Sequence, residues 1–366
     1  MARGLTRRTL LAGAGASALA GCLGSLSDPA TDPTDDVPPA GPDIPPTRED
    51  RLPLPMAPAA LREQAVSGGP PKDGIPSIDD PTFVPAAQAT DHLAPADPVF
   101  GLAMAGSAKA YPQSILVWHE ICNDTIADTP VSVTYCPLTG TAMGFKRGQT
   151  TFGVSGRLVN NNLIMYDRAT ETWWPQVLAT AIPGPWHPDP PIRSLRAVRV
   201  TWTTWDRWHT DHPETQVLSR DTGYARNYDR DPYGSYNPRD GYYAPHAAPL
   251  FAPLNQDDRL PPKRVVIGAR TTTAAIAIEK DTLRDTPIID GTVGTTPIVA
   301  VYDPTLDTGY VYTNPDRHQF DHEDGQVIDE TGARHAPDSL PLAQIPAFDA
   351  MWFAWSGFYP DTTLYA

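Results

Sequence analysis

The chain repeats itself, and this internal duplication limits the folds it can adopt more than any other feature. Residues 99–103 are answered by residues 266–269, and residues 130–137 by residues 297–304 at the same offset. The copies also end with the same spacing of tryptophan, proline and threonine: Trp205, Trp208, Pro213 and Thr215 in the first, Trp352, Trp355, Pro360 and Thr362 in the second. We therefore expect one domain built from two related halves.

The repeated segments have the patterns of short strands and short helices. Residues 131–135 and 298–302 are runs of β-branched and aromatic residues that lead to a proline, which is typical of buried strands. Paired tryptophans three positions apart share one face of a helix and usually belong to a core. The sequence predicts an α+β, β-rich fold with two internally duplicated halves and short helices.

The boundaries of this arrangement follow from the repeat. We expect the duplicated domain to span residues 51–366, with half one at about 95–219 and half two at 264–366. Residues 220–263 are rich in Tyr, Asp, Pro and Gly without periodicity, so they are expected to form a connecting loop.

Comparing the copies separates structural residues from candidates for chemistry. A residue that the fold needs tends to appear in both copies, whereas a residue present once is free for another role. Cys136 is matched by Asp303, and no counterpart of the polar segment 118–124 is evident before Thr296. The candidates for chemistry therefore belong to the first copy.

One interpretation of these candidates is a metal site. Imidazole and thiolate are the ligands that copper and zinc select, so His119, Cys122 and Cys136 form a possible copper or zinc set. An opposed interpretation is a binding module without chemistry, which holds a partner, a glycan or a small ligand. In that case Cys122 and Cys136 are free to form a structural disulfide.

A third interpretation is an enzyme with a cysteine nucleophile. Cys136 would be the nucleophile and His119 the base that activates it, with Glu120, Asp124 or Asn123 orienting the ring. Thiol nucleophiles need such a base because the thiolate is the reactive form. The sequence leaves all three interpretations open.

Other polar residues have weaker claims on a site. Asp167 is echoed by Asp329, which favours a structural turn at this point of both copies. Arg157 and Gln176 have no match in the second copy, so they are expected to line the same cleft as His119.

The N-terminus has the features of an exported lipoprotein. Residues 1–21 have a basic start, an apolar centre and small residues before a cysteine, as secretory signals do. Arg7 and Arg8 are typical of a twin-arginine signal, which the twin-arginine export machinery reads. Cys22 is expected to carry the lipid that anchors the chain to the extracytoplasmic face of the membrane. Residues 22–50 are predicted to form a disordered tether.

The amino-acid composition limits the classes of binding partner. The net charge is −15, with Asp and Glu outnumbering Lys and Arg by 43 to 28. A nucleic-acid partner requires a positive surface, so it is excluded. The basic residues are mostly Arg, and an acidic, lysine-poor surface is typical of proteins in concentrated salt, which indicates a haloarchaeal source.

Several motifs in order resemble an uncharacterised family known as domain of unknown function 3179. The matching pieces are Lys72 to Pro76, Ala110 to Pro112, Trp118 to Glu120 with Asn123 and Asp124, Tyr135 to Leu138, Tyr166 to Arg168 with Thr170, Trp173 with Gln176, and Trp352 to Thr362. The resemblance covers about residues 72 to 366 and implies no activity. Many members have a second cysteine where this chain has Thr139, which argues against a redox-active dithiol here.

Overall fold

The computed structural model describes residues 44–89 and 92–366. The predicted signal with Arg7 and Arg8, the predicted lipidation site Cys22 and the predicted tether as far as residue 43 lie outside the described residues. Within the described part, no helix has the length and apolar character needed to cross a membrane.

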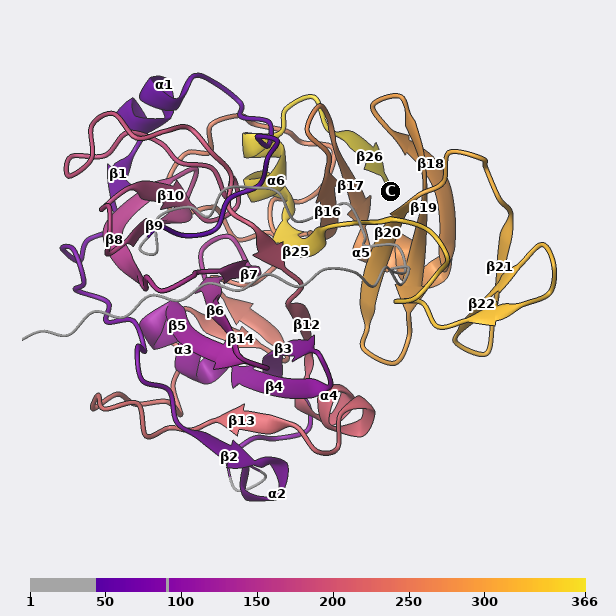
Figure 1. Ribbon diagram of the computed structural model, residues 1–366, viewed down its shortest axis with the longest axis horizontal. Helices are drawn as coiled ribbons and strands as arrows, with labels where there is room; N and C mark the ends of the chain where they lie inside the picture. Colours follow the sequence, from indigo (N-terminus) through magenta and orange to yellow (C-terminus); the bar gives the residue numbers. More distant parts are fainter. Residues whose placement is uncertain (1–43, 90–91) are drawn as a thin grey trace, which may run out of the picture. The chain divides into compact units, whose positions relative to one another are not determined.

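The first half and the described segment before it contain three sheets (Figure 1). The largest has the order β12-β3-β4-β13-β2, with β2 (Phe83–Pro85), β3 (Pro98–Met104), β4 (Ser107–Pro112), β12 (Thr201–Thr204) and β13 (Gln216–Leu218). The second has the order β11-β7-β6-β5, with β5 (Ile121–Ile126), β6 (Thr129–Cys136), β7 (Thr141–Lys146) and β11 (Ala197–Val198). The third has the order β1-β8-β9-β10, with β1 (Val66–Ser67), β8 (Phe152–Val159), β9 (Asn162–Asp167) and β10 (Trp173–Pro175). The helices are α1 (Pro58–Glu63), α2 (Ala86–Ala89), α3 (Gln113–His119) and α4 (Trp205–Asp211).

The second half also contains three sheets, drawn in orange and yellow in Figure 1. One has the order β25-β16-β17-β26, with β16 (Val265–Arg270), β17 (Ala275–Glu279), β25 (Ala347–Met351) and β26 (Thr363–Tyr365). The next has the order β18-β19-β20-β24, with β18 (Ile288–Val293), β19 (Thr296–Asp303), β20 (Thr308–Thr313) and β24 (Gln344–Ile345). The last has the order β21-β22-β23, with β21 (Phe320–Glu323), β22 (Gln326–Asp329) and β23 (Arg334–His335). The helices are α5 (Lys280–Asp285) and α6 (Trp352–Phe358), and the connecting loop holds a hairpin of β14 (Gly234–Tyr236) and β15 (Arg239–Gly241).

The two halves share one topology, which confirms the predicted α+β, β-rich fold with duplicated halves. The order β12-β3-β4-β13 is repeated as β25-β16-β17-β26, and β11-β7-β6-β5 as β24-β20-β19-β18. The segment 118–124 does have a structural counterpart, contrary to expectation, because α3 and β5 correspond to α5 and β18. Tyr135 N–H donates to the Glu120 carbonyl at 2.7 Å just as Tyr302 N–H donates to the Pro287 carbonyl at 2.8 Å. The strand is repeated, but its polar side chains are not.

The paired tryptophans fill the same place in both halves. A Cβ atom on Gly101 would lie 2.2 Å from the Trp208 ring, and one on Gly268 would lie 2.2 Å from the Trp355 ring. Each of the two tryptophans donates its indole N–H to the threonine seven residues later, at 2.9 and 3.0 Å. Glycine is therefore required beneath each ring, and the repeat encodes one packing unit twice.

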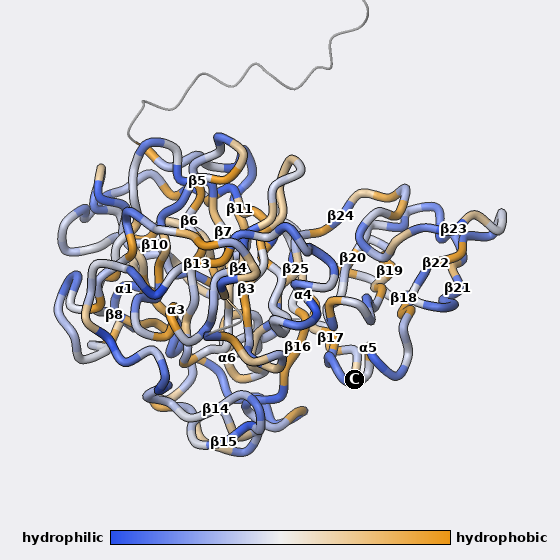
Figure 2. Tube along the Cα trace, turned by 90° about the horizontal axis from the view of Figure 1, so that it is seen from below, coloured by the Kyte–Doolittle hydropathy of each residue, from blue (hydrophilic) through white to orange (hydrophobic). Residues whose placement is uncertain are grey.

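Hydrophobic residues follow the strands that these units share. Figure 2 shows apolar colouring along parts of β6, β7 and β3, while many of the surrounding loops are hydrophilic. The β5-β6-β7 sheet has an apolar cluster on each face. Cys122 lies opposite Val133 in the β5-β6 pair, and both pack on one face. Cys136, an odd number of positions further along β6, packs on the other face.

The last residues assigned to the tether belong to the folded domain. Arg48 N–H donates to the Ser194 carbonyl at 2.7 Å, and Arg196 N–H donates to the Pro46 carbonyl at 3.1 Å. Thr47 and Leu195 form a β-bridge. The domain therefore begins before residue 51, because the backbone here finds hydrogen-bond partners in the loop between β10 and β11.

Candidate functional site

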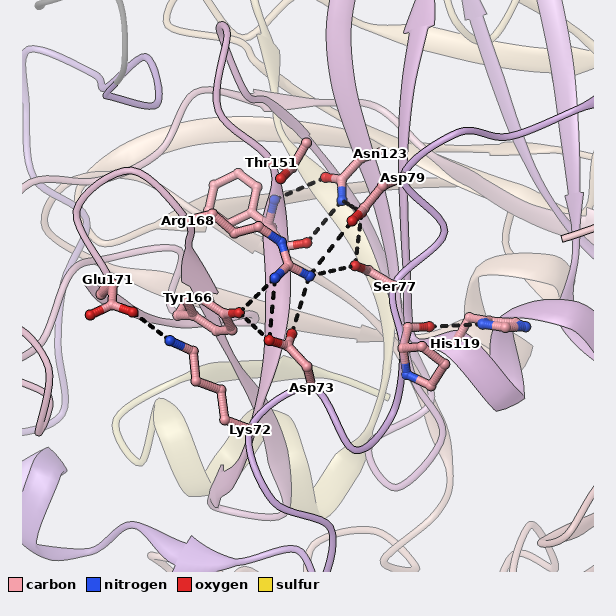
Figure 3. Close-up of polar contacts among 12 residues, drawn as sticks. Lys72, Asp73, Ser77, Asp79, His119, Asn123, Thr151, Tyr166, Arg168 and Glu171 are labelled. Atoms are coloured by element: carbon pink, nitrogen blue, oxygen red, sulfur yellow. Dashed lines mark hydrogen bonds and ion pairs between the residues drawn. The ribbon is translucent and has the colours of Figure 1, made fainter. Parts of the chain in front are cut away.

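Three segments, two of them in the first half, bring their polar side chains to one place (Figure 3). They are the loop that follows β1, which precedes the first half, the strand β5, and the end of β9 with the turn that follows it. We call this set the motif cluster, and its members are Lys72, Asp73, Ser77, Asp79, Asn123, Tyr166, Arg168 and Glu171. The positions equivalent to Asn123, Tyr166 and Arg168 in the second half hold Asp290, Ile328 and Glu330. These three members of the cluster are therefore not repeated in the second half.

Asp73 and Arg168 form the centre of the motif cluster. Arg168 donates one hydrogen bond to each Asp73 carboxylate oxygen, at 3.1 and 3.2 Å. The Tyr166 hydroxyl donates to the same carboxylate and receives a hydrogen bond from Arg168 at 2.9 Å. Burial and then the hydrogen bond to Asp73 raise the pKa of Tyr166, so its hydroxyl stays protonated. A Cβ atom on Gly153 would lie 2.7 Å from Asp73 Oδ1, so only glycine leaves room for this arrangement.

Asn123 fixes the other end of the cluster. Its amide donates to Asp79 Oδ1 at 2.6 Å. Its carbonyl oxygen accepts from Ser132 Oγ at 2.6 Å and from Phe152 N–H at 3.0 Å, which sets the orientation of the amide. Ser77 Oγ donates to Asp79 at 2.8 Å. Asn123 is buried in β5, so its hydrogen bond to Asp79 comes from a rigid strand.

Lys72 closes the cluster on its third side. Its ammonium group pairs with Glu171 and lies 4.4 and 4.3 Å from the ring centroids of Tyr166 and Trp186, a cation–π arrangement. The side chains of the charged members keep between 30% and 45% of their surface exposed. A ligand from solvent can therefore reach these groups without rearrangement of the backbone.

His119 lies at the edge of the cluster and is already engaged on both sides of its ring. Nδ1 is 2.8 Å from the Pro76 carbonyl oxygen, which can only accept, so Nδ1 carries the proton. Nε2 is 2.7 Å from the Tyr228 hydroxyl and accepts from it. Burial lowers the pKa of His119, which favours this neutral form. The ring therefore has no free lone pair for a metal ion.

The structure does not bring the expected metal ligands together. Among residues 44–89 and 92–366, no group of three or more His, Cys, Asp or Glu side chains is placed to hold a metal ion. Cys122 and Cys136 are both buried and free, so they form no disulfide either. The physical reason is the pleat of β5 and β6, which directs the two thiols to opposite faces of the sheet. The copper or zinc set of His119, Cys122 and Cys136 is not formed.

Cys136 has the surroundings of a structural thiol. Its Sγ donates to the Asn161 carbonyl at 3.6 Å and accepts from Leu163 N–H at 3.4 Å. Burial raises its pKa to about 11, so it is a neutral thiol near neutral pH. No hydrogen bond in the described part of the chain joins it to His119, the base that the nucleophile interpretation requires.

Glu120 is the most unusual of the predicted residues. It is only 7% exposed, and no hydrogen bond from a described residue reaches its carboxylate. Burial raises its pKa to about 8. Its backbone is left-handed, with φ 58°, a conformation that costs free energy in a residue with a side chain. Its charge acts on Cys136 and on Tyr233 of the connecting loop, which places these three groups near one another.

The remaining expected residues have structural partners. Asp124 pairs with Lys109 at 2.8 Å and accepts from the Tyr111 hydroxyl at 2.7 Å. Arg157 is exposed on β8, opposite β1. Gln176 is buried, and its side-chain amide forms hydrogen bonds with threonine hydroxyls of β6 and β7. Gln176 and His119 have no exposed surface, so they do not line an open cleft together.

The turn after β9 is both structural and part of the cluster. Asp167 accepts from Thr170 N–H at 2.6 Å, and Asp329 accepts from Thr331 N–H at 2.9 Å, so the repeated aspartates build related turns. The sequence predicted a structural turn here, and no role in a site was expected for Tyr166 and Arg168. Their replacement in the second copy by Ile328 and Glu330 was the signal that could have identified them.

All members of the motif cluster fall within the segment that a family model matches. The model is described as "Protein of unknown function (DUF3179)" and matches residues 72–362. The chain belongs to this family. Comparison with curated proteins and with solved structures gives no match.

Proposed function

We propose that this chain is a lipid-anchored extracytoplasmic protein that binds a neutral, polyhydroxylated ligand, such as a glycan, at the motif cluster. The location is supported by the sequence around Cys22, which resembles a lipid attachment site, and by Arg7 and Arg8, which resemble a twin-arginine signal. The observation that carries the proposed activity is the charge balance of the cluster.

The net charge of the cluster is small, so the cluster attracts neither anions nor cations strongly. Two cations, Lys72 and Arg168, face three carboxylates, Asp73, Asp79 and Glu171. An anion would meet one excess negative charge, and each cation already has a carboxylate partner. A metal cation would find only Asp79 without a short ion pair, and Arg168 Nη2 lies 3.6 Å from its Oδ2. A neutral ligand therefore suits the cluster better than either ion.

Hydroxyl groups match the pattern that remains. Each hydroxyl both donates and accepts, and the cluster presents acceptors on Asp79 and Glu171 beside donors on Lys72 and Arg168. Several adjacent hydroxyls on one ring can engage such paired groups without displacing the ion pairs. Hydrogen bonds to charged groups contribute more than neutral ones, about 1.5–3 kcal/mol each.

The cluster is also prepared for binding in advance. Asn123 is fixed by Ser132 and by the backbone of Phe152, and the Asp73 carboxylate is held by Tyr166 and Arg168. Side chains that are already ordered lose little entropy when a ligand binds. The half-buried Trp186 lies beside Lys72 and supplies an apolar surface next to these polar groups.

A glycan array tests this function. The detergent-solubilised full chain is applied to an array of neutral and anionic oligosaccharides. We expect signal on a subset of neutral glycans that exceeds the signal on sulfated or sialylated ones. An array on which no neutral glycan gives signal above the detergent blank contradicts the proposal.

Glu120 favours a second candidate function, an enzyme. A buried carboxyl group with a raised pKa and no hydrogen-bond partner is a typical general acid. In this candidate the protonated Glu120 donates a proton to a substrate, and Cys136 is a neutral neighbour and not a nucleophile. The second candidate requires the tyrosine-rich connecting loop to move, because Tyr233 lies near the carboxyl group.

A further inference from the structure

A cavity at the junction of the two halves is separate from the motif cluster. It has a volume of about 320 Å³, within the roughly 300–1,000 Å³ range of small-molecule pockets. Thr203 of β12 comes from the first half, Tyr236 and Arg239 from the connecting hairpin, and Lys280 and Arg284 from α5 of the second half. We call it the junction cavity. Its walls come from both copies, so it exists only in the duplicated chain.

Among the side chains that line the junction cavity, one cation lacks a carboxylate partner. Four cations and three carboxylates line it, and three of the cations are paired. The pairs are Lys280 with Asp349, Arg284 with Asp307 and Arg264 with Asp281, each at 2.7 Å. Arg239 is the remaining cation, and in the described part of the chain no carboxylate lies within ion-pair distance of it. Its guanidinium donates to the Lys263 carbonyl at 3.3 Å and lies 5.8 Å from the Tyr236 ring centroid.

Thr203 adds a polar group that lacks a partner. It is 4% exposed, and among the described residues its Oγ1 has no hydrogen-bond partner although the atom is buried. An unsatisfied buried hydroxyl costs stability unless a ligand or water completes it. Thr203 lines the junction cavity, but its Oγ1 is itself buried, so this hydroxyl belongs to the wall of the cavity and is not counted among the groups that bind a ligand.

Aromatic rings form an apolar wall beside these polar groups. Trp202 and Tyr236 both line the junction cavity, and their ring centroids are 5.1 Å apart in an edge-to-face arrangement. Pro98 and Met351 extend the apolar surface. A planar apolar group fits against such a wall.

We propose that the junction cavity binds a small organic monocarboxylate with a planar apolar body. The carboxylate pairs with Arg239, whose planar guanidinium suits a carboxylate. The apolar body lies against Trp202 and Tyr236. This site is independent of the motif cluster and of the function proposed there.

Calorimetric titration of the detergent-solubilised full chain with benzoate tests the site. Benzamide, which has the same shape without the charge, is the matched ligand control. We expect one saturable site for benzoate, with benzamide at least about tenfold weaker, the size of one charge-assisted contact. Arg239→Gln is expected to weaken benzoate by about tenfold, and Arg239→Lys by less, because it keeps the charge.

Two further variants keep the outcome clear. Thr203→Val is expected to raise the thermal unfolding midpoint of the ligand-free protein, because it removes an unpartnered buried hydroxyl, and to keep the wild-type affinity for benzoate. Arg334→Gln is the matched control, since Arg334 is an exposed arginine paired with Glu323 on another sheet. Arg168→Gln is expected to leave benzoate affinity unchanged, which separates this site from the motif cluster. No saturable benzoate binding, or equal affinity in wild type and Arg239→Gln, overturns the proposal.

Discussion

Arg168 donates two hydrogen bonds, of 3.1 and 3.2 Å, to the carboxylate of Asp73, although the two residues are 95 positions apart in the chain. The pair joins a loop that precedes the first copy to a turn inside that copy. The equivalent turn of the second copy holds Glu330, which cannot make this contact. The two copies therefore share the turn, but the contact with a preceding loop is made by the turn of the first copy.

The close packing of Gly101 and Gly268 against the tryptophan rings predicts that adding one methyl group at either glycine destabilises the fold. Gly101→Ala and Gly268→Ala each place a Cβ atom 2.2 Å from an indole ring that is packed on all sides. We expect each variant to lower the free energy of unfolding by about 3 kcal/mol, measured by urea denaturation. Gly68→Ala is the control, since its Cβ atom would meet its nearest neighbour at 3.4 Å. Similar stability for all three variants would refute the packing argument.

Cys122 and Cys136 are expected to be unreactive toward alkylating reagents in the native protein. Both thiols are buried, and the pKa of Cys136 is raised to about 11. We expect iodoacetamide near pH 7 to label neither residue in the native protein and both in denaturant, as followed by intact mass. Rapid alkylation of Cys136 in the native protein would revive the nucleophile interpretation.

Glu120 predicts a specific dependence of stability on pH. Its pKa is raised from 4.5 to about 8 in the folded state, so between these values the folded protein holds a proton that the unfolded chain releases. Stability should therefore fall as the pH rises from about 4.5 to about 8, by an amount on the order of a few kcal/mol. Glu120→Gln should remove this part of the pH dependence. Parallel stability curves for wild type and variant would show that Glu120 is not buried as described.

The lipoprotein proposal predicts a processed N-terminus. Intact mass of the native protein should show loss of residues 1–21 and a gain of lipid mass on Cys22. Cys22→Ala should leave unprocessed or soluble protein, and lysine at both Arg7 and Arg8 should block export. Normal maturation and membrane partition of Cys22→Ala would rule out the anchor.

The repeat and the fold class could be predicted from the sequence, because residues that pack in the same way in both halves recur with the same spacing. The tryptophan spacing and the two strands that contain Tyr135 and Tyr302 recur with their neighbours, and the structure places them in matching elements. The β5 strand was harder to match, because only the backbone is repeated in β18 while the side chains differ.

The candidate site was predicted less well, and the reason is geometric. His119 and Cys136 are chemically suggestive residues, but sheet pleating and local hydrogen bonds assign them to the interior. Asp73 and Arg168 became neighbours only through long-range folding, which no local pattern encodes. Both nevertheless lie in motifs of the family resemblance, and the mismatch with Glu330 marked Arg168 as specific to one copy.

The most direct test of the motif cluster compares Arg168→Gln with its matched control at the duplicated position, Glu330→Gln, on the glycan array used for the wild type. The account predicts that Arg168→Gln loses about tenfold or more of the neutral-glycan signal, while Glu330→Gln keeps the wild-type pattern. Thermal unfolding of both variants verifies that each is folded. Equal signal from folded Arg168→Gln and wild type would contradict the assignment of the ligand site to this cluster.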